Sequence, residues 1–104
     1  MIENIRILMK RPGEKVSVVE PANELKALQH LVDGYIEVVR LATDLAVICN
    51  EEGRLMRLPY NVSICGYDFV GTILIVGVDG EEFADLPVDV SVIKLLMPQL
   101  WEAA

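Results

Sequence analysis

The sequence is poor in the residues that most often carry catalysis and bind metals. It has one histidine and two cysteines, so a Cys–His or Ser–His arrangement has a single candidate base, His30. We place His30 on the wet face of a predicted helix. Cys49 and Cys65 lie in apolar contexts, at a spacing typical of neither a zinc site nor a disulfide framework, and we interpret both as reduced, mostly buried packing residues. We therefore expect a protein that is not an enzyme, with no metal and no cofactor.

Long apolar runs and phosphate-binding glycine motifs are also missing. The longest uninterrupted apolar runs, such as 73–76, are far shorter than the roughly 20 residues that cross a bilayer, so no membrane partner is expected. The glycines at 66, 71, 77 and 80 have the wrong spacing for a dinucleotide or P-loop motif. The acidic residues lack the alternating ligand spacing of a calcium loop. The first residues show no signal-peptide pattern, which favours a cytoplasmic protein.

Basic residues are few: the chain has 9 basic and 16 acidic residues, for a net charge of -7. This balance disfavours direct binding of nucleic acid. The acidic surface either keeps an apolar domain soluble or binds a basic groove of another protein. Hydrophobic residues make up 53% of the chain, above the roughly 45–50% of soluble domains. This excess predicts self-association, and we expect a homo-oligomer.

The first third of the sequence has the pattern of a hairpin followed by a helix. Apolar β-rich segments at 4–9 and 15–20 flank a polar turn with Pro and Gly, which predicts a β-hairpin. A helix follows over 23–33, with Asn23 as its cap and Gly34 as its left-handed stop. The apolar residues that fall at helical spacing are Leu25, Leu28, Leu31 and Val32.

The middle of the chain reads as an antiparallel meander, with strands at 35–41 and 45–49 that lead through a polar turn into 54–58. Because Pro59 cannot donate a ladder hydrogen bond and Gly66 breaks the next segment, we expect 59–70 to be irregular or an edge strand.

The last third of the chain begins with a predicted central strand. The run 72–78 is continuous in β-branched and aliphatic residues, as in a strand buried on both faces. A helix is predicted to start near Pro87. The whole pattern predicts one α+β domain over residues 1–104, with a mainly antiparallel sheet of about five strands, the 23–33 helix on one face and a C-terminal helix.

The tail 95–101 has apolar residues on more of its circumference than packing against one core would bury. We expect it to pack against another subunit. The alternative is that the tail folds back over the sheet of its own chain.

One group of polar residues suits a ligand. Arginine offers a bidentate fork for phosphate or carboxylate, tyrosine a stacking face, and asparagine both a donor and an acceptor. These types predict a site for a nucleotide-like ligand, with Tyr35 nearby, formed by Asn50, Arg54, Arg57, Tyr60 and Asn61. In the alternative interpretation the asparagines form turns, Tyr60 lies at the core rim, and the arginines pair with Glu51 or Glu52.

Four segments, 27–39, 48–53, 58–61 and 71–77, resemble a known family in order and spacing. It is the family of small bacterial, plasmid and phage proteins catalogued as domain of unknown function 3846. The resemblance covers about residues 4 to 86, and the tail after Leu86 departs from it. A shared turn architecture is implied by the matching residues Asn50, Glu51, Gly53, Pro59 and Asn61. The resemblance also implies a setting in mobile elements, where small domains often counter host defence, and it carries over no catalytic residue.

Two hypotheses of function follow. The first is a non-enzymatic, anti-defence binding protein of a phage or mobile element, which sequesters a nucleotide-derived signalling molecule between subunits in the cytoplasm of a bacterial host. The second is a protein–protein inhibitor of a host defence enzyme, such as a CRISPR or restriction nuclease, that acts through its acidic or apolar surface. A regulatory or structural module without a ligand is a third possibility.

Overall fold

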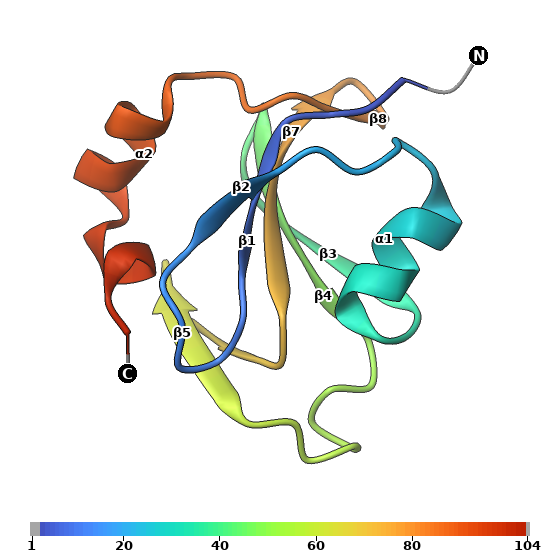
Figure 1. Cartoon of the computed structure of the whole chain (residues 1–104), viewed down its shortest axis with the longest axis vertical. Coiled ribbons are helices and arrows are strands. Elements are labelled where there is room, and N and C mark those ends of the chain that lie inside the picture. Colours follow the sequence, from blue (N-terminus) through green and yellow to red (C-terminus); the bar gives the residue numbers. More distant parts are fainter. Residues whose placement is uncertain (1–2, 104) are drawn as a thin grey trace.

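A six-stranded antiparallel sheet forms the centre of the molecule. The computed structural model describes residues 3–103, and five strands follow one another across the sheet in the order β2-β1-β7-β4-β3, with β8 paired to β7 as well (Figure 1). The strands are β1 (Ile7–Lys10), β2 (Ser17–Val19), β3 (Ile36–Ala42), β4 (Leu45–Asn50), β7 (Ile73–Asp79) and β8 (Glu82–Ala84). The predicted N-terminal hairpin, β1–β2, and the predicted 35–49 hairpin, β3–β4, are both confirmed.

Strand β7 is the spine of the sheet, as its unbroken apolar run predicts. Residues 73–78 are buried, and the strand pairs with β1 on one side and β4 on the other. The sequence interpretation missed β8, which follows β7 through a turn in which Gly80 has φ +64°. The predicted fold class, α+β with a mainly antiparallel sheet, is confirmed.

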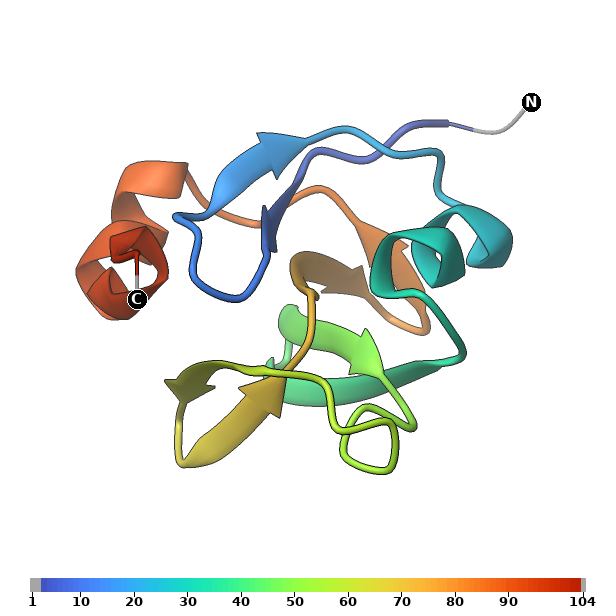
Figure 2. The same ribbon diagram turned by 60° about the horizontal axis from the view of Figure 1, so that its bottom comes forward.

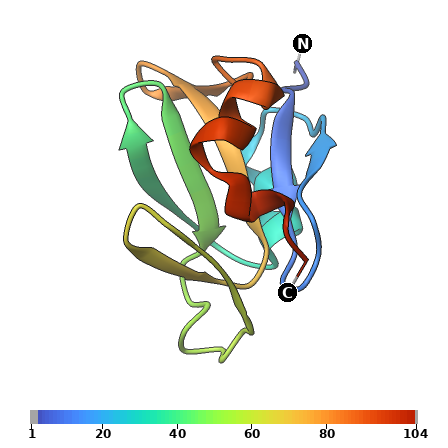
Figure 3. The same ribbon diagram turned by 90° about the vertical axis from the view of Figure 1, so that its left-hand side faces the viewer.

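The sheet is covered on both faces, which produces two apolar cores. On one face, α1 (Leu25–Val32) packs Leu28 and Val32 against strand residues such as Leu74. The other face is covered by α2 (Val90–Leu96), the short 3-10 helix η1 (Pro98–Trp101) and a separate hairpin of β5 (Tyr60–Ile64) and β6 (Tyr67–Val70). Figure 3 looks onto this second face, with α2 in front and α1 behind the sheet.

Helix α1 is shorter than predicted, and its ends are built differently. The N-cap is Glu24, without a side-chain cap, and Asn23 lies one residue before it, with its Nδ2 donating to Phe83 O at 2.9 Å. The left-handed residue at the other end is Asp33, with φ 61°, and not Gly34. Leu25, which we expected on the buried face, is exposed because it lies at the first turn beyond the edge of the core.

The segment after β4 also differs from the prediction. Residues 51–57 form consecutive turns, so the expected strand at 54–58 is wrong. The segment 59–70, which we expected to be irregular or an edge strand, forms the hairpin β5–β6 in a two-stranded sheet of its own, where both strands are edge strands (Figure 2). Cys65 occupies the turn of this hairpin with φ 50°, so it is exposed, whereas Cys49 is buried as expected.

The C-terminal helix exists, but it begins three residues after Pro87. Asp89 caps it, because its carboxylate accepts from the Ser91 backbone N–H (2.9 Å) and hydroxyl (3.0 Å); these two bonds lower the pKa of Asp89. Leu100 is fully buried within its own chain. The tail thus folds back over its own sheet, although Leu95 stays 83% exposed. In the described residues no helix is long and apolar enough to cross a membrane.

Candidate functional site

The five residues predicted to form one site lie in three places. Asn50 and Arg54 line one cavity, between β3, β4 and β6. Tyr60 and Asn61 line a second cavity, between β5 and the C-terminal segment. Arg57 lies in the turns after β4, has φ 55°, and lines neither cavity.

Asn50 is buried and joins β4 to the end of α1. Its Nδ2 donates to the carbonyl oxygens of Val32 (3.0 Å) and Asp33 (3.2 Å). Its Oδ1 accepts from the backbone N–H of Glu52 at 2.8 Å. Because its donors and its acceptor are occupied, the side chain holds the helix terminus and the turn in place.

The cavity beside Asn50 is small, at about 140 Å³. The Arg54 guanidinium crosses its rim and donates to Asp68 O at 2.6 Å. Cys49 lines its floor, and burial, with a smaller contribution from the Glu37 carboxylate, raises the pKa of its thiol to about 11. A thiol with this pKa stays protonated and is a poor nucleophile at neutral pH, so we interpret Cys49 as a packing residue.

The second cavity contains a residue that the sequence interpretation missed, Lys10. It ends β1, where its side chain points to the same face of the sheet as Leu8, and it is only 1% exposed. Its Nζ donates to Asn61 Oδ1 at 3.0 Å, and this is its one hydrogen-bond partner among the described residues. Asn61 Nδ2 in turn donates to Lys10 O (2.8 Å) and Gly71 O (2.7 Å). All four residues of β1 are buried, and the burial of position 10 depends on distant segments that pack over the strand end, so no local pattern in the sequence identifies the lysine.

The Lys10 pocket, as we call this second cavity, has a volume of about 280 Å³. It is open at one side, and its polar lining consists of Lys10, Tyr60, Asn61, Ser63, Gln99 and Glu102. These residues come from β1, from β5 and from the segment that includes η1. The pocket thus depends on the packing of the hairpin and the C-terminal segment over the sheet.

Hydrogen bonds fix most of the pocket wall. Tyr60 OH and Ser63 Oγ lie 2.6 Å apart, and Ser63 Oγ donates to Asp68 Oδ1 at 2.5 Å. Gln99 Nε2 donates to Ser63 O at 3.0 Å, which ties η1 to β5. Tyr60 is 57% exposed and lines the pocket. The wall is therefore preorganised and offers a stacking surface.

The electrostatics of the pocket centre on the Lys10 ammonium. Burial lowers the pKa of Lys10, and the nearby Glu14 carboxylate raises it by a smaller amount. Burying a charge is costly unless it is paired, and Asn61 is a neutral partner. Glu102 also lines the pocket, but among the described residues no carboxylate forms a hydrogen bond with Nζ, so an anionic group that reached Nζ would give it a charged partner.

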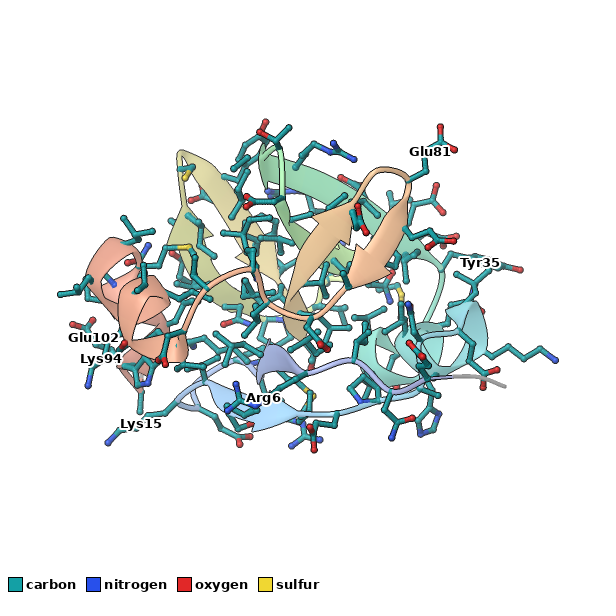
Figure 4. All side chains as sticks on the ribbon, turned by 90° about the horizontal axis from the view of Figure 1, so that it is seen from above. Arg6, Lys15, Tyr35, Glu81, Lys94 and Glu102 are labelled. Atoms are coloured by element: carbon teal, nitrogen blue, oxygen red, sulfur yellow. The ribbon has the colours of Figure 1, made fainter. Side chains whose placement is uncertain are left out.

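Acidic side chains elsewhere do not assemble into a metal site. Among residues 3–103, no group of three or more His, Cys, Asp or Glu side chains could hold a metal ion. In Figure 4, Glu81 projects from the β7–β8 turn, far from Lys94 and Glu102 at the end with α2 and η1. The β7–β8 turn therefore presents an acidic surface and not a cation site.

The sequence matches the family described as Domain of unknown function (DUF3846) over residues 5–98. The chain belongs to the DUF3846 family. The match to DUF3846 continues past Leu86, so our expectation that the tail departs from the family there was wrong; α2 is part of the matched region. No curated protein and no solved structure matches the chain.

Proposed function

We propose that this chain is a non-enzymatic binding protein that holds a nucleotide-derived anion in the Lys10 pocket. The observation that carries the proposal is the buried Lys10 ammonium, whose one partner among the described residues is a neutral amide. A phosphate oxygen that reached Nζ would form a charge-assisted hydrogen bond with the ammonium group. The ligand thereby offsets the cost of burying the charge.

The rest of the pocket suits the other parts of a nucleotide. The exposed ring of Tyr60 offers a stacking surface for a base, and such stacking contributes about 1–3 kcal/mol. Ser63 and Gln99 present polar atoms beside it, and the rim carboxylate of Glu102 is an acceptor for a ribose hydroxyl or an exocyclic amine. The volume of about 280 Å³ lies just below the usual range of ligand sites, roughly 300–1,000 Å³, which favours a compact or cyclic nucleotide.

The biological role we attach to this site is sequestration. A binding protein that removes a nucleotide-derived signal from the cytoplasm of a bacterial host would suit a phage or mobile element that must evade host defence. Such a role needs tight binding and no turnover. It is consistent with a pocket in which one cation, one ring and a few amides and hydroxyls converge.

Isothermal titration calorimetry with a panel of cyclic nucleotides and cyclic ADP-ribose isomers tests this proposal. We expect at least one member of the panel to bind, and Lys10→Met and Tyr60→Ala each to weaken that binding by at least about tenfold, which corresponds to about 1.4 kcal/mol. The matched control is Tyr67→Ala. Tyr67 is a comparably exposed tyrosine of the same hairpin, at 51%, but it lines the cavity of Arg54.

Two results would count against the Lys10 pocket. Binding that is lost in Tyr67→Ala and kept in Tyr60→Ala would move the ligand to the Arg54 cavity. A panel that gives no heat at all would remove the support for a nucleotide ligand. The second candidate, a protein–protein inhibitor, would then be favoured, because Leu95 leaves an apolar surface on α2 and Glu81 lies on an acidic one.

A further inference from the structure

We infer that strand β3 is a self-association surface, on which β3 of a second copy of this chain pairs in antiparallel orientation and joins the two sheets. β3 is the outermost strand of the six-stranded sheet and pairs with β4 alone. In Figure 3 it lies at the left-hand edge, and β2 lies at the opposite edge. The inference rests on this edge and does not depend on the ligand proposed for the Lys10 pocket.

The hydrogen-bonding direction of each β3 residue follows from its register. Glu51 N donates to Tyr35 O at 2.8 Å, and Ile36 lies opposite Asn50. Alternate residues of an antiparallel strand direct their N–H and C=O groups to the same neighbour, so Tyr35, Glu37 and Val39 face β4. The backbone groups of Ile36, Val38 and Arg40 therefore point away from the sheet, where the described residues place no strand.

The two edges of the sheet differ in how they are protected. β2 has three residues, and charged residues and a proline flank it: Glu14, Lys15, Glu20 and Pro21. Short strands, charges and proline are the usual means of preventing pairing at an edge. β3 has seven residues, and Val38 at its centre is 44% exposed. The β3 edge is thus the longer one, and the residue at its centre is apolar, with Glu37 and Arg40 on either side.

The sequence of β3 is compatible with pairing to itself. A two-fold axis at Val38 places the two Val38 residues opposite each other and Ile36 opposite the apolar stem of Arg40. In this register the outward N–H and C=O groups of both copies form hydrogen bonds at Ile36, Val38 and Arg40. No charged side chain lies directly opposite a like charge. Glu37 meets its own copy only diagonally, on the face where Arg54 lines the same cavity. A second copy therefore pairs with residues 36–40, up to the register shift between Arg40 and Ala42.

The test is the mass in solution across a dilution series, measured by sedimentation velocity on the full chain. The decisive variant is Val38→Pro, since the N–H that proline removes points outward and the ladder to β4 stays intact. Val38→Lys provides a second route, because it places like charges opposite each other at the axis. The matched control is Val38→Thr, which keeps both the β-branched shape and the N–H.

We expect a dimer for the wild type and for Val38→Thr. Val38→Pro and Val38→Lys should raise the dimer dissociation constant on the order of tenfold to a hundredfold, with unchanged far-ultraviolet circular dichroism. A wild type that is monomeric at every concentration would overturn the inference. A dimer that survives Val38→Lys and dissociates with Leu95→Lys would also overturn it, since the interface would then lie on α2.

Discussion

At the scale of single residues, Lys10 has an unusual environment. Its ammonium lies beneath β5 on the face of the sheet that is packed with apolar side chains, and Asn61 is the partner the structure gives it. Below the folded pKa, the native state bears the cost of burying this charge. As the pH rises through that pKa toward the ordinary value of 10.5, the unfolded chain binds more protons than the folded one, so the free energy of unfolding rises.

This linkage gives the first prediction. Between neutral pH and about pH 10.5, the wild type should gain stability relative to Lys10→Met, a variant that keeps the apolar stem and removes the titrating group. Urea denaturation of both proteins at several pH values measures the difference, and titrations shared by the two chains largely cancel in it. A difference that stays constant with pH would mean that the pKa of Lys10 is the same in the folded and unfolded states.

The residue scale also shows what the sequence could reveal about the site. Asn50 and Asn61 were recognised as unusual from their types, but their burial and their partners depend on segments far apart in the sequence. Lys10 was not recognised, because one basic residue at the end of an apolar strand looks like a normal strand end. Only the packing of β5 and η1 over that strand end makes it a buried charge.

At the scale of elements, the link between β4 and α1 depends on the Asn50 side chain. Asn50→Ala removes two donated bonds and one accepted bond in a buried place. We expect the free energy of unfolding to fall by about 2–4 kcal/mol, because the carbonyl groups at the end of α1 lose their donor. Chemical denaturation measures this loss.

The control for Asn50 comes from the same turn. Glu52→Ala keeps the backbone N–H that bonds to Asn50 and alters only an exposed side chain, so its effect should stay within about 0.5 kcal/mol. Equal losses for the two variants would show that the turn is sensitive to any change. The proposed role of the amide would then lack support.

The elements that could be predicted were those defined by local patterns. The β1–β2 and β3–β4 hairpins and the central strand β7 follow from apolar alternation, turn residues and an unbroken apolar run. The β5–β6 hairpin was missed because Pro59 and Gly66 are local signals against a strand, whereas its stability comes from Val62, Ile64 and Phe69 in the core. The prediction of a cap at Asn23 was wrong: the helix begins after Glu24, and the Asn23 side chain donates to Phe83 O, 60 residues away.

At the scale of the whole molecule, the C-terminal segment completes one of the two cores. Leu100 is fully buried, and its carbonyl oxygen accepts from Val16 N at 2.9 Å, next to β2. Deleting residues 100–104 should therefore lower the Tm by at least about 10 °C, since the loss of one buried leucine alone costs about 2–5 kcal/mol. Differential scanning calorimetry measures the change.

The matched control for the deletion removes residues 102–104 alone and keeps Leu100 and Trp101 in the core. It should change the Tm much less than the longer deletion. Both shortened chains should have the same number of subunits in solution as the full chain, because the segment packs within its own protomer. If the deletion of residues 100–104 leaves the Tm unchanged and reduces the number of subunits in solution, the tail packs between chains instead.

The place of β7 in the chain has a consequence for how the protein is made. Among the described strands, the one at the centre of the sheet is the seventh of eight to leave the ribosome, so β1 can pair with β2 early but cannot pair with β7 until late in synthesis. Until then the β1–β2 and β3–β4 hairpins have both been synthesised, but the strand that joins them in the sheet, β7, is missing. Pairing over such sequence distances is slow, so the nascent chain exposes apolar strand faces for most of its synthesis, and the emergence of β7 assembles the sheet in one late step.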